Sequence, residues 1–484
     1  MKSLYKKIDL EHILFALIST LLLFGTDFLP EYATDSYFTF TTDELWKHML
    51  YDNGRVIGAI IYYFFENIFA VTDKAVYLIS YLSGILFLSI SIYIVSSRLR
   101  LYCHNKYISV AISTLLCANL FSVEYFLFLE TGIFMLAFLI TVLAFLNTIY
   151  YFEEQKNKYL IRTLILLILA VNMYQIFLAA YVILCLPYII KYSKTCLMFV
   201  KYNLIVVLMY TFSMGTGVIV TKVFLSSSRL NHNEFKFTQI IDVLHHIKAI
   251  CLVANNVIPK YLFAGAVLVI FILCLGLILY SKRYIQVAQI LYISMMITGL
   301  SFAPHYLGIT DDYSTRIIYP FAMIIGVLLC HMYVNMNLET APQRWRTAAY
   351  LFIFMYFGLQ LVAFNIIFVN RYKCNQTDKY LCEMIYDRIE QYEQNNNLKV
   401  TNICFYQDKN PSAVYEDMSY VAFTPRAFDY SWSDLYSLIY FSGRPFSRGV
   451  KCDEYEKYFY DRDWNIYSDE QLVFDGDTLH LCVY

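Results

Sequence analysis

Apolar runs long enough to cross a lipid bilayer recur along this chain of 484 residues. A bilayer core about 30 Å thick requires roughly 20 apolar residues in a helix, and each crossing segment must satisfy its own backbone hydrogen bonds. About eleven segments approach this length. They cover residues 12–28, 75–95, 107–120, 132–151, 160–171, 176–190, 204–224, 261–280, 285–302, 317–334 and 347–369. The pattern therefore predicts a mainly α-helical, polytopic membrane protein.

The composition excludes an ordinary soluble domain. Hydrophobic residues make up 59% of the chain and charged residues 15%, whereas about 45–50% and about 25% are usual for soluble proteins. The formal net charge of -1 gives no general affinity for polyanions, so we expect no nucleic-acid partner.

Basic residues predict which side of the membrane each connection occupies. Lys and Arg are concentrated before the first apolar run and in every second connection after it. The basic connections contain Arg98, Arg100 and Lys106; Lys156, Lys158 and Arg162; Lys191, Lys194 and Lys201; Lys282 and Arg283; and Arg344 and Arg346. Because cytoplasmic loops carry an excess of positive charge, the N-terminus is predicted to be cytoplasmic in a multi-pass protein of the plasma or inner membrane.

The polarity changes after the last apolar run, which predicts two domains. Residues 1–370 form the transmembrane domain, with a long first outer loop at 29–74. An odd number of crossings places residues 371–484 on the extracytoplasmic side. There, a polar helix with apolar positions at Leu381, Ile385 and Ile389 precedes two predicted strands, which indicates a small α+β domain.

An apolar segment at 55–71, inside the first outer loop, is near the shortest length that could cross a bilayer. If it crossed, every later connection would change sides and the basic pattern would be inverted. We therefore interpret it as an interfacial or partly re-entrant helix.

Acidic residues gather in the first outer loop. Asp35 follows the first apolar run, and a carboxylate at this boundary is a candidate general base toward a sugar hydroxyl. From the residues alone, an N-cap role for Asp35 is a strong alternative. Asp43 and Glu44 precede apolar residues at helical spacing, so they are either supporting acids or first-turn residues of an interfacial helix.

Two arginines are candidates for binding a phosphate. Arg55 follows the turn sequence "DNG", and Arg316 begins the tenth apolar run on the same predicted side. A guanidinium group binds oxyanions through two parallel hydrogen bonds. The alternatives are interfacial anchoring for both arginines and, for Arg55, a salt bridge to Asp52.

Polar residues in the remaining outer turns are candidates for hydrogen bonds to sugar hydroxyls. They are Glu124, Tyr174, Gln175, Asp311 and Asp312. For tyrosine, the alternative is the aromatic belt at the membrane interface. His245, His246 and His305 lack a second ligand at metal-binding spacing, so no metal site is predicted. No cofactor is expected, and dependence on a divalent metal is left open.

The chain resembles the membrane glycosyltransferases of the GT-C superfamily, in particular the bacterial Gtr-type glucosyltransferases that modify O-antigen or other surface polysaccharides. The resemblance covers roughly residues 1–370 and depends on short segments in the outer loops. These segments are "ATDSYF", "DNGRVIGAII", "NLFSVEYFLFLE", "MYQ" and "TDDYSTRIIYP". The family more often has two adjacent acids in the first loop, whereas Asp35 lies between Thr34 and Ser36.

The resemblance implies an inverting hexosyltransferase on the extracytoplasmic face. The donor would be a polyprenyl-phosphate hexose, with glucose the expected sugar, and the acceptor a polysaccharide or other glycan. Asp35 would be the base, while Arg55 and Arg316 would bind the donor phosphate. Two alternatives stay open: a polymerase or ligase of lipid-linked polysaccharide, and a flippase or transporter of lipid-linked sugars, for which charged residues within several membrane segments would be expected.

Overall fold

The computed structural model describes residues 9–25, 32–42, 45–68, 73–224, 238–253, 262–306, 313–407, 426–462, 464 and 468–482. These residues are mainly helical. Their contacts divide the chain into two compact units. Unit 1 comprises Met1–Phe28, Trp46–Phe126 and Glu130–Asn365, and unit 2 comprises Leu29–Leu45, Leu127–Leu129 and Ile366–Tyr484.

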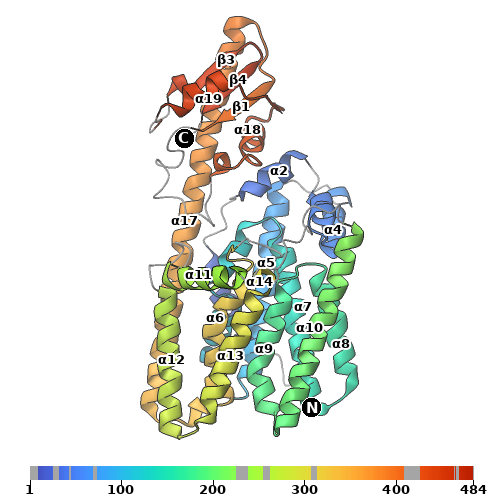
Figure 1. The fold of residues 1–484 in the computed structure, drawn as a ribbon, viewed down its shortest axis with the longest axis vertical. Coiled ribbons are helices and arrows are strands. Elements are labelled where there is room, and N and C mark those ends of the chain that lie inside the picture. The colour runs from blue at the N-terminus through green and yellow to red at the C-terminus, as the bar shows by residue number, and fades with distance from the viewer. Residues whose placement is uncertain are drawn as a thin grey trace. The chain divides into compact units, whose positions relative to one another are not determined.

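Unit 1 is a bundle of helices that lie side by side (Figure 1). Its first half contains α1 (Leu10–Phe24), η2 (His48–Asp52), α4 (Val56–Tyr63), η3 (Phe64–Ile68), α5 (Asp73–Leu99), α6 (Lys106–Cys117), η4 (Leu120–Leu127), α7 (Thr131–Glu154), α8 (Asn157–Val171) and α9 (Phe177–Tyr192). Its second half contains α10 (Cys196–Phe224), α11 (Thr238–Val253), α12 (Leu262–Ser281), α13 (Ile285–Ser301), α14 (Ala303–Tyr306), α15 (Tyr319–Ala322), α16 (Ile324–Val334), η7 (Leu338–Thr340) and the start of α17 (Gln343–Asn396). Helix α7 packs against α5, α8 and α9.

Among the described residues, five helices are long and apolar enough to cross a membrane: α5, α7, α10, α12 and α17. The bent pair α6 and η4, with an angle of 64° between its helices, brings the number to six if the pair counts as one crossing. Several other apolar helices, including α1, α9, α13 and α16, are shorter. The prediction of a mainly helical chain is thus confirmed, together with several helices long and apolar enough to cross a membrane. The eleven crossings stay a prediction.

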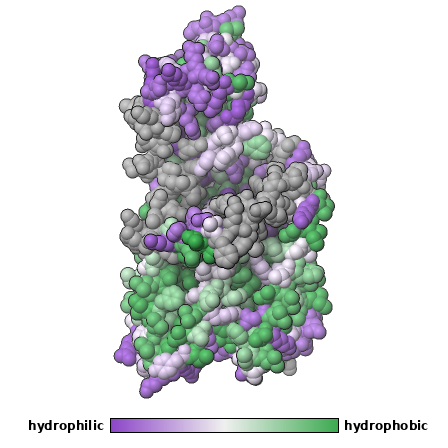
Figure 2. Space-filling model, viewed as in Figure 1, coloured by the Kyte–Doolittle hydropathy of each residue, from purple (hydrophilic) through white to green (hydrophobic). Residues whose placement is uncertain are grey.

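The surface of unit 1 has the polarity expected of such helices. Figure 2 shows hydrophobic residues over the sides of the helices and hydrophilic residues at the end where α12 and α13 are connected. Many apolar side chains along the helices face outward, among them Leu204, Leu268 and Phe354, which are 56%, 61% and 63% exposed. A face of this kind is suited to lipid chains.

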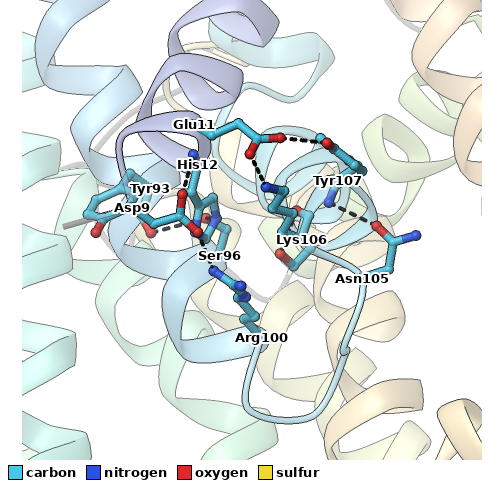
Figure 3. Close-up of polar contacts among 10 residues, drawn as sticks. Asp9, Glu11, His12, Tyr93, Ser96, Arg100, Asn105, Lys106 and Tyr107 are labelled. Carbon is cyan, nitrogen blue, oxygen red and sulfur yellow. Dashed lines mark hydrogen bonds and ion pairs between the residues drawn. The ribbon is translucent and has the colours of Figure 1, made fainter. Parts of the chain in front are cut away.

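The start of α1 contacts the basic connection between α5 and α6. Asp9 at the start of α1 accepts a hydrogen bond from Nη1 of Arg100, over 2.8 Å (Figure 3). Glu11 forms an ion pair with Lys106 and accepts a hydrogen bond from the hydroxyl of Tyr107. These contacts connect the N-terminal end of α1 to the short connection between α5 and α6.

An ion pair with a buried arginine lies at the ends of α5 and α7. Arg98 is 1% exposed and pairs with Glu153, whose carboxylate also accepts a hydrogen bond from the hydroxyl of Tyr192 in α9. These contacts bring the ends of α5, α7 and α9 together.

The segment predicted to be interfacial or re-entrant forms α4 followed by the π-helical turn η3. It belongs to the shorter apolar helices rather than to those long enough to cross a membrane. The backbone N–H of Ile57 donates to the carbonyl of Asn172, so the start of α4 is held by the turn between α8 and α9.

Unit 2 is built around a four-stranded sheet in the order β2-β1-β4-β3. The strands are β1 (Asn402–Tyr406), β2 (Ser447–Arg448), β3 (Leu472–Asp475) and β4 (Thr478–Cys482). β1 is parallel to β2 and β4, and β3 and β4 form an antiparallel hairpin. The helices are α2 (Thr34–Thr42), α18 (Asp434–Ser442), α19 (Asp453–Tyr460) and the polar half of α17, with η8 (Ala427–Asp429) and η9 (Asp469–Gln471) between them.

The polar half of α17 packs on this sheet through the apolar positions predicted from the sequence. Ile385 and Ile389 are buried in one cluster with Ile403, Leu438 and Leu479, and Leu381 is buried in a second cluster with Cys404 and Phe459. The two predicted strands correspond to β1 and β4. The sequence did not indicate that residues 29–45 belong to unit 2, where the backbone N–H of Tyr32 donates to Oδ1 of Asn375 in α17.

Candidate functional site

Arg55 is presented by a tight turn between η2 and α4. Its backbone N–H donates to the carbonyl of Met49, and its own carbonyl accepts from the N–H of Ala59. Gly54 before it has a φ of +64°, and an added Cβ there would lie 2.9 Å from Oγ1 of Thr221. This turn therefore requires glycine both for its backbone angle and for the close approach of α10.

The guanidinium of Arg55 lies over two aromatic rings. Its Cζ is 4.8 Å from the ring centroid of Tyr174 and 5.4 Å from that of Phe134. Tyr174 is buried in the turn between α8 and α9, and Phe134 is buried in the first turns of α7. Packing a guanidinium face against rings restricts its position and leaves its N–H groups in the plane of the group, the geometry used for binding oxyanions.

Arg316 is fixed by Glu124. Nη1 of Arg316 lies 3.3 Å from Oε1 of Glu124, and its backbone N–H donates to Oε2 of the same carboxylate over 2.7 Å. The hydroxyl of Thr315 also donates to Oε2, over 2.6 Å. Glu124 is 3% exposed and Arg316 is 31% exposed, so a buried acid holds a partly accessible cation.

Tyr125 connects the two arginines. Its hydroxyl donates to the carbonyl of Arg316 over 2.5 Å, and its ring contacts Tyr174 edge to face at 5.6 Å. Burial raises the pKa of Tyr174 to about 12, while the positive charges of Arg55 and Arg316 act in the opposite direction. Tyr174 therefore experiences both charges, and four residues predicted from separate loops converge: Arg55, Glu124, Tyr174 and Arg316. We call this set the arginine cluster.

Two aromatic members of this environment were not predicted from the sequence. Phe134 and Tyr125 were not singled out, because aromatic residues are so frequent in this chain that their positions gave no signal. Thr315 was also missed, although its place beside Arg316 was a usable signal. Gln175 is half-buried, and its carbonyl accepts a hydrogen bond from the N–H of Leu178. Asp311, Asp312, Asp43 and Glu44 lie outside the described residues.

A cavity of about 150 Å³ lies beside α4 and η3 in the same unit. It is lined mostly by apolar side chains of α4, η3, α5 and α7, including Ile61, Phe65, Ile79 and Leu136. The helix that follows Arg55 therefore lines an apolar cavity with its last turn.

Asp35 belongs to unit 2. It lies in the first turn of α2 rather than at the position that caps the helix, and a carboxylate there is favoured by the helix dipole. One of its oxygens accepts a hydrogen bond from Nε1 of Trp432 over 3.0 Å. Asp35 is exposed to solvent.

Two of the three histidines considered as metal ligands form ring contacts. His246 and His305 both stack on Tyr313, with ring centroids 3.7 Å and 4.1 Å from it. Within the described part of the chain, no group of three or more His, Cys, Asp and Glu residues is arranged to hold a metal ion. Comparison of the chain with protein-family models found no match, and comparisons with curated proteins and with solved structures also found none.

Proposed function

We propose that this protein is an inverting glycosyltransferase that moves a hexose, expected to be glucose, from a polyprenyl-phosphate donor to a polysaccharide or other glycan. The observation that carries the proposal is the arginine cluster, in which Arg55 lies over the ring of Tyr174 and Arg316 is linked to the same ring through Tyr125. Two cations held by aromatic rings and a buried acid can bind a phosphate that gains negative charge as the sugar leaves it.

The proposed reaction uses three groups. An acceptor hydroxyl attacks the anomeric carbon, the bond from that carbon to the phosphate oxygen breaks, and the polyprenyl phosphate leaves with the electron pair. Arg55 and Arg316 stabilise the leaving phosphate. Asp35 takes the proton of the hydroxyl. The assignment of Asp35 depends on its place after the first apolar run and on the resemblance.

We also propose the topology that this reaction requires. The membrane domain would cross the bilayer eleven times, with the N-terminus in the cytoplasm and residues 371–484 outside. The support is the concentration of Lys and Arg in alternate connections. In unit 1, the contacts of Asp9, Glu11, Arg98, Arg100 and Lys106 join several of these basic connections.

The experiment measures donor binding and transfer by the purified protein in lipid nanodiscs, with radiolabelled polyprenyl-phosphate glucose. Replacing Arg55 or Arg316 by Ala should weaken donor binding by about 10- to 100-fold, since a hydrogen bond to a charged group contributes about 1.5–3 kcal/mol. Arg55→Lys retains the charge but not the planar fork, so it should bind with intermediate affinity. Arg283→Ala, which removes an exposed arginine between α12 and α13, is the matched control.

Three outcomes would contradict parts of the proposal. Unchanged donor binding by both alanine variants would contradict the assignment of Arg55 and Arg316 to the phosphate. Full transfer by Asp35→Asn would contradict the assignment of Asp35 as the base. Transfer of a lipid-linked oligosaccharide but of no monosaccharide would identify a polymerase or ligase instead. Movement of the lipid across the bilayer without transfer would identify a flippase. A chelator added to the same assay tests for dependence on a divalent metal.

A further inference from the structure

Two stacked aromatic rings of unit 2 lie beside Asp35. Tyr430 and Trp432 stack with their ring centroids 4.3 Å apart and an angle of 20° between the ring planes. Trp432 is 49% exposed although it is one of the largest apolar side chains of the protein. Its Nε1–H donates to the exposed carboxylate of Asp35 over 3.0 Å. An accessible ring and an accessible carboxylate are therefore joined directly.

The turn that carries these rings is held by many hydrogen bonds. The backbone N–H groups of Ser433 and Asp434 both donate to the carbonyl of Tyr430, each over 3.0 Å. Arg448 binds the carboxylate of Asp434 and donates to the carbonyl of Ser431 over 2.5 Å. The exposed ring of Trp432 and the half-buried ring of Tyr430 are thus presented by a rigid turn, so little conformational entropy would be lost when a ligand binds.

Asp35 is held against this turn by the packing of α2 on α18. The ring of Tyr440 contacts those of Tyr37 and Phe40, at centroid distances of 5.7 Å and 5.4 Å. Phe38 contacts Tyr436 edge to face at 4.9 Å. The bond between Asp35 and Trp432 therefore belongs to a packed interface inside unit 2.

We propose that Trp432, Tyr430 and Asp35 form a binding site for a hexopyranose ring of a glycan. A pyranose has an apolar face of C–H groups, which packs on the electron-rich face of an aromatic ring, and it has hydroxyl groups around its edge, which donate to a carboxylate. The stacked rings supply the first contact and Asp35 the second. The alternative is that Trp432 anchors unit 2 at a membrane interface. Asp35 makes this less favourable, because its negative charge is repelled by anionic lipid headgroups.

This inference rests on the proposed function in one respect only, namely that the bound hexopyranose ring is part of the acceptor glycan. The hydroxyl that reacts would then be presented to Asp35 by the aromatic surface. Binding of the sugar does not require transfer, so the two proposals can fail separately.

The test is equilibrium binding of radiolabelled tetrasaccharides of glucose, galactose and mannose to the full-length protein in nanodiscs. At least one should bind, and Trp432→Ala should weaken this binding by about tenfold or more, since the stacking surface is lost. Trp432→Phe retains a flat ring and should bind with intermediate affinity. Tyr460→Ala removes another exposed aromatic residue of unit 2, which is 59% exposed, and should bind like the wild type.

Absence of binding by all three sugars would overturn the inference, and so would wild-type affinity in Trp432→Ala. Quenching of Trp432 by brominated lipids, without sugar binding, would identify an interfacial anchor instead. Sugar binding without any transfer would support this site and contradict the proposed function. Transfer with an unchanged acceptor KM in Trp432→Ala would support the function and contradict this site.

Discussion

The guanidinium of Arg55 lies over the ring of Tyr174, with 4.8 Å between Cζ and the ring centroid. Because Tyr174 is 4% exposed, the ring is a fixed support for the cation. The position of the Arg55 side chain is therefore restricted by a residue more than one hundred positions later in the chain. Under the proposed function, this position is the one that meets the phosphate of the donor.

The ring of Tyr174, rather than its hydroxyl, should therefore determine donor affinity. Tyr174→Leu removes the ring and should weaken binding of polyprenyl-phosphate glucose by about 2- to 30-fold, the equivalent of about 0.5–2 kcal/mol for a cation–π contact. Tyr174→Phe retains the ring and should bind nearly as well as the wild type. Equal affinities of the two variants would show that the ring does not support Arg55.

Gly54 should be intolerant of a side chain. Alanine in its place would adopt a φ of +64°, which costs about 1–2 kcal/mol for a residue other than glycine. Its Cβ would also meet Thr221, with 3.2 Å to the Cα of that residue. Gly54→Ala should therefore lower both the melting temperature and the affinity for the donor, since Arg55 is the next residue.

The control for this variant is Gly215→Ala in α10. An added Cβ at Gly215 meets no atom within 4 Å, and alanine favours a helix over glycine by about 1 kcal/mol. Its melting temperature should be equal to or higher than that of the wild type, as measured by differential scanning fluorimetry in detergent. A lower value in Gly215→Ala than in Gly54→Ala would contradict the assignment of strain to the turn.

The arginine cluster also shows how far sequence reasoning reaches in this protein. Arg55, Glu124, Tyr174 and Arg316 were each found from their place in a turn predicted to be on the outer side, where polar residues beside apolar runs are conspicuous. The two arginines are predicted to bind one phosphate, but the contact of Arg55 with Tyr174 and that of Arg316 with Glu124 were not predicted. These contacts depend on the bend between α6 and η4 and on the turn that begins α4. Glu124 is predicted to contact a sugar, which stays a prediction, and in the structure its carboxylate has three hydrogen-bond or ionic contacts with Thr315 and Arg316.

The contact between Asp35 and Trp432 was beyond sequence reasoning. The two residues are separated by 397 positions, and neither local periodicity nor turn chemistry carries information over that distance. The short strands β2 and β3 were missed for a related reason, since strands of two and four residues are too short for an alternating pattern to be recognised.

His480 in β4 should make unit 2 sensitive to mild acid. It is 4% exposed, and burial lowers its pKa from the ordinary value of 6.5, although Asp475 acts in the opposite direction. Its Nδ1 is hydrogen-bonded to the hydroxyl of Tyr406 over 2.9 Å. The Tyr406 hydroxyl accepts a hydrogen bond from the N–H of Cys452, so its own proton can be donated to the neutral imidazole of His480. The ring of Tyr455 packs against His480, with 4.0 Å between the ring centroids.

The sign of the effect follows from this lowered pKa. The unfolded chain binds a proton more readily, so the stabilisation by neutral His480 is complete above pH 6.5 and is lost as the pH falls below 6.5 toward the pKa in the folded state. Hydrogen exchange of the amides in β1 and β4 should therefore accelerate below this pH in the wild type. His480→Gln should remove the pH dependence, whereas His104→Gln, at an exposed position of unit 1, should leave it unchanged. An identical pH profile in His480→Gln would contradict the assignment.

Native cysteines give a direct test of the proposed topology. Cys196 at the start of α10 and Cys452 before α19 are exposed, whereas the other cysteines for which the structure describes burial are buried. Cys196 lies in a connection predicted to be cytoplasmic, and Cys452 lies in the domain predicted to be extracytoplasmic. A maleimide that cannot cross membranes should therefore label Cys452 on intact cells and label Cys196 only after the cells are opened.

The labelling should be carried out in a Cys251→Ser variant, so that Cys251 adds no signal. The further variants Cys452→Ser and Cys196→Ser assign each signal to its cysteine. Labelling of both cysteines on intact cells would show that the number of crossings between them is even, and the proposed eleven crossings would then be wrong.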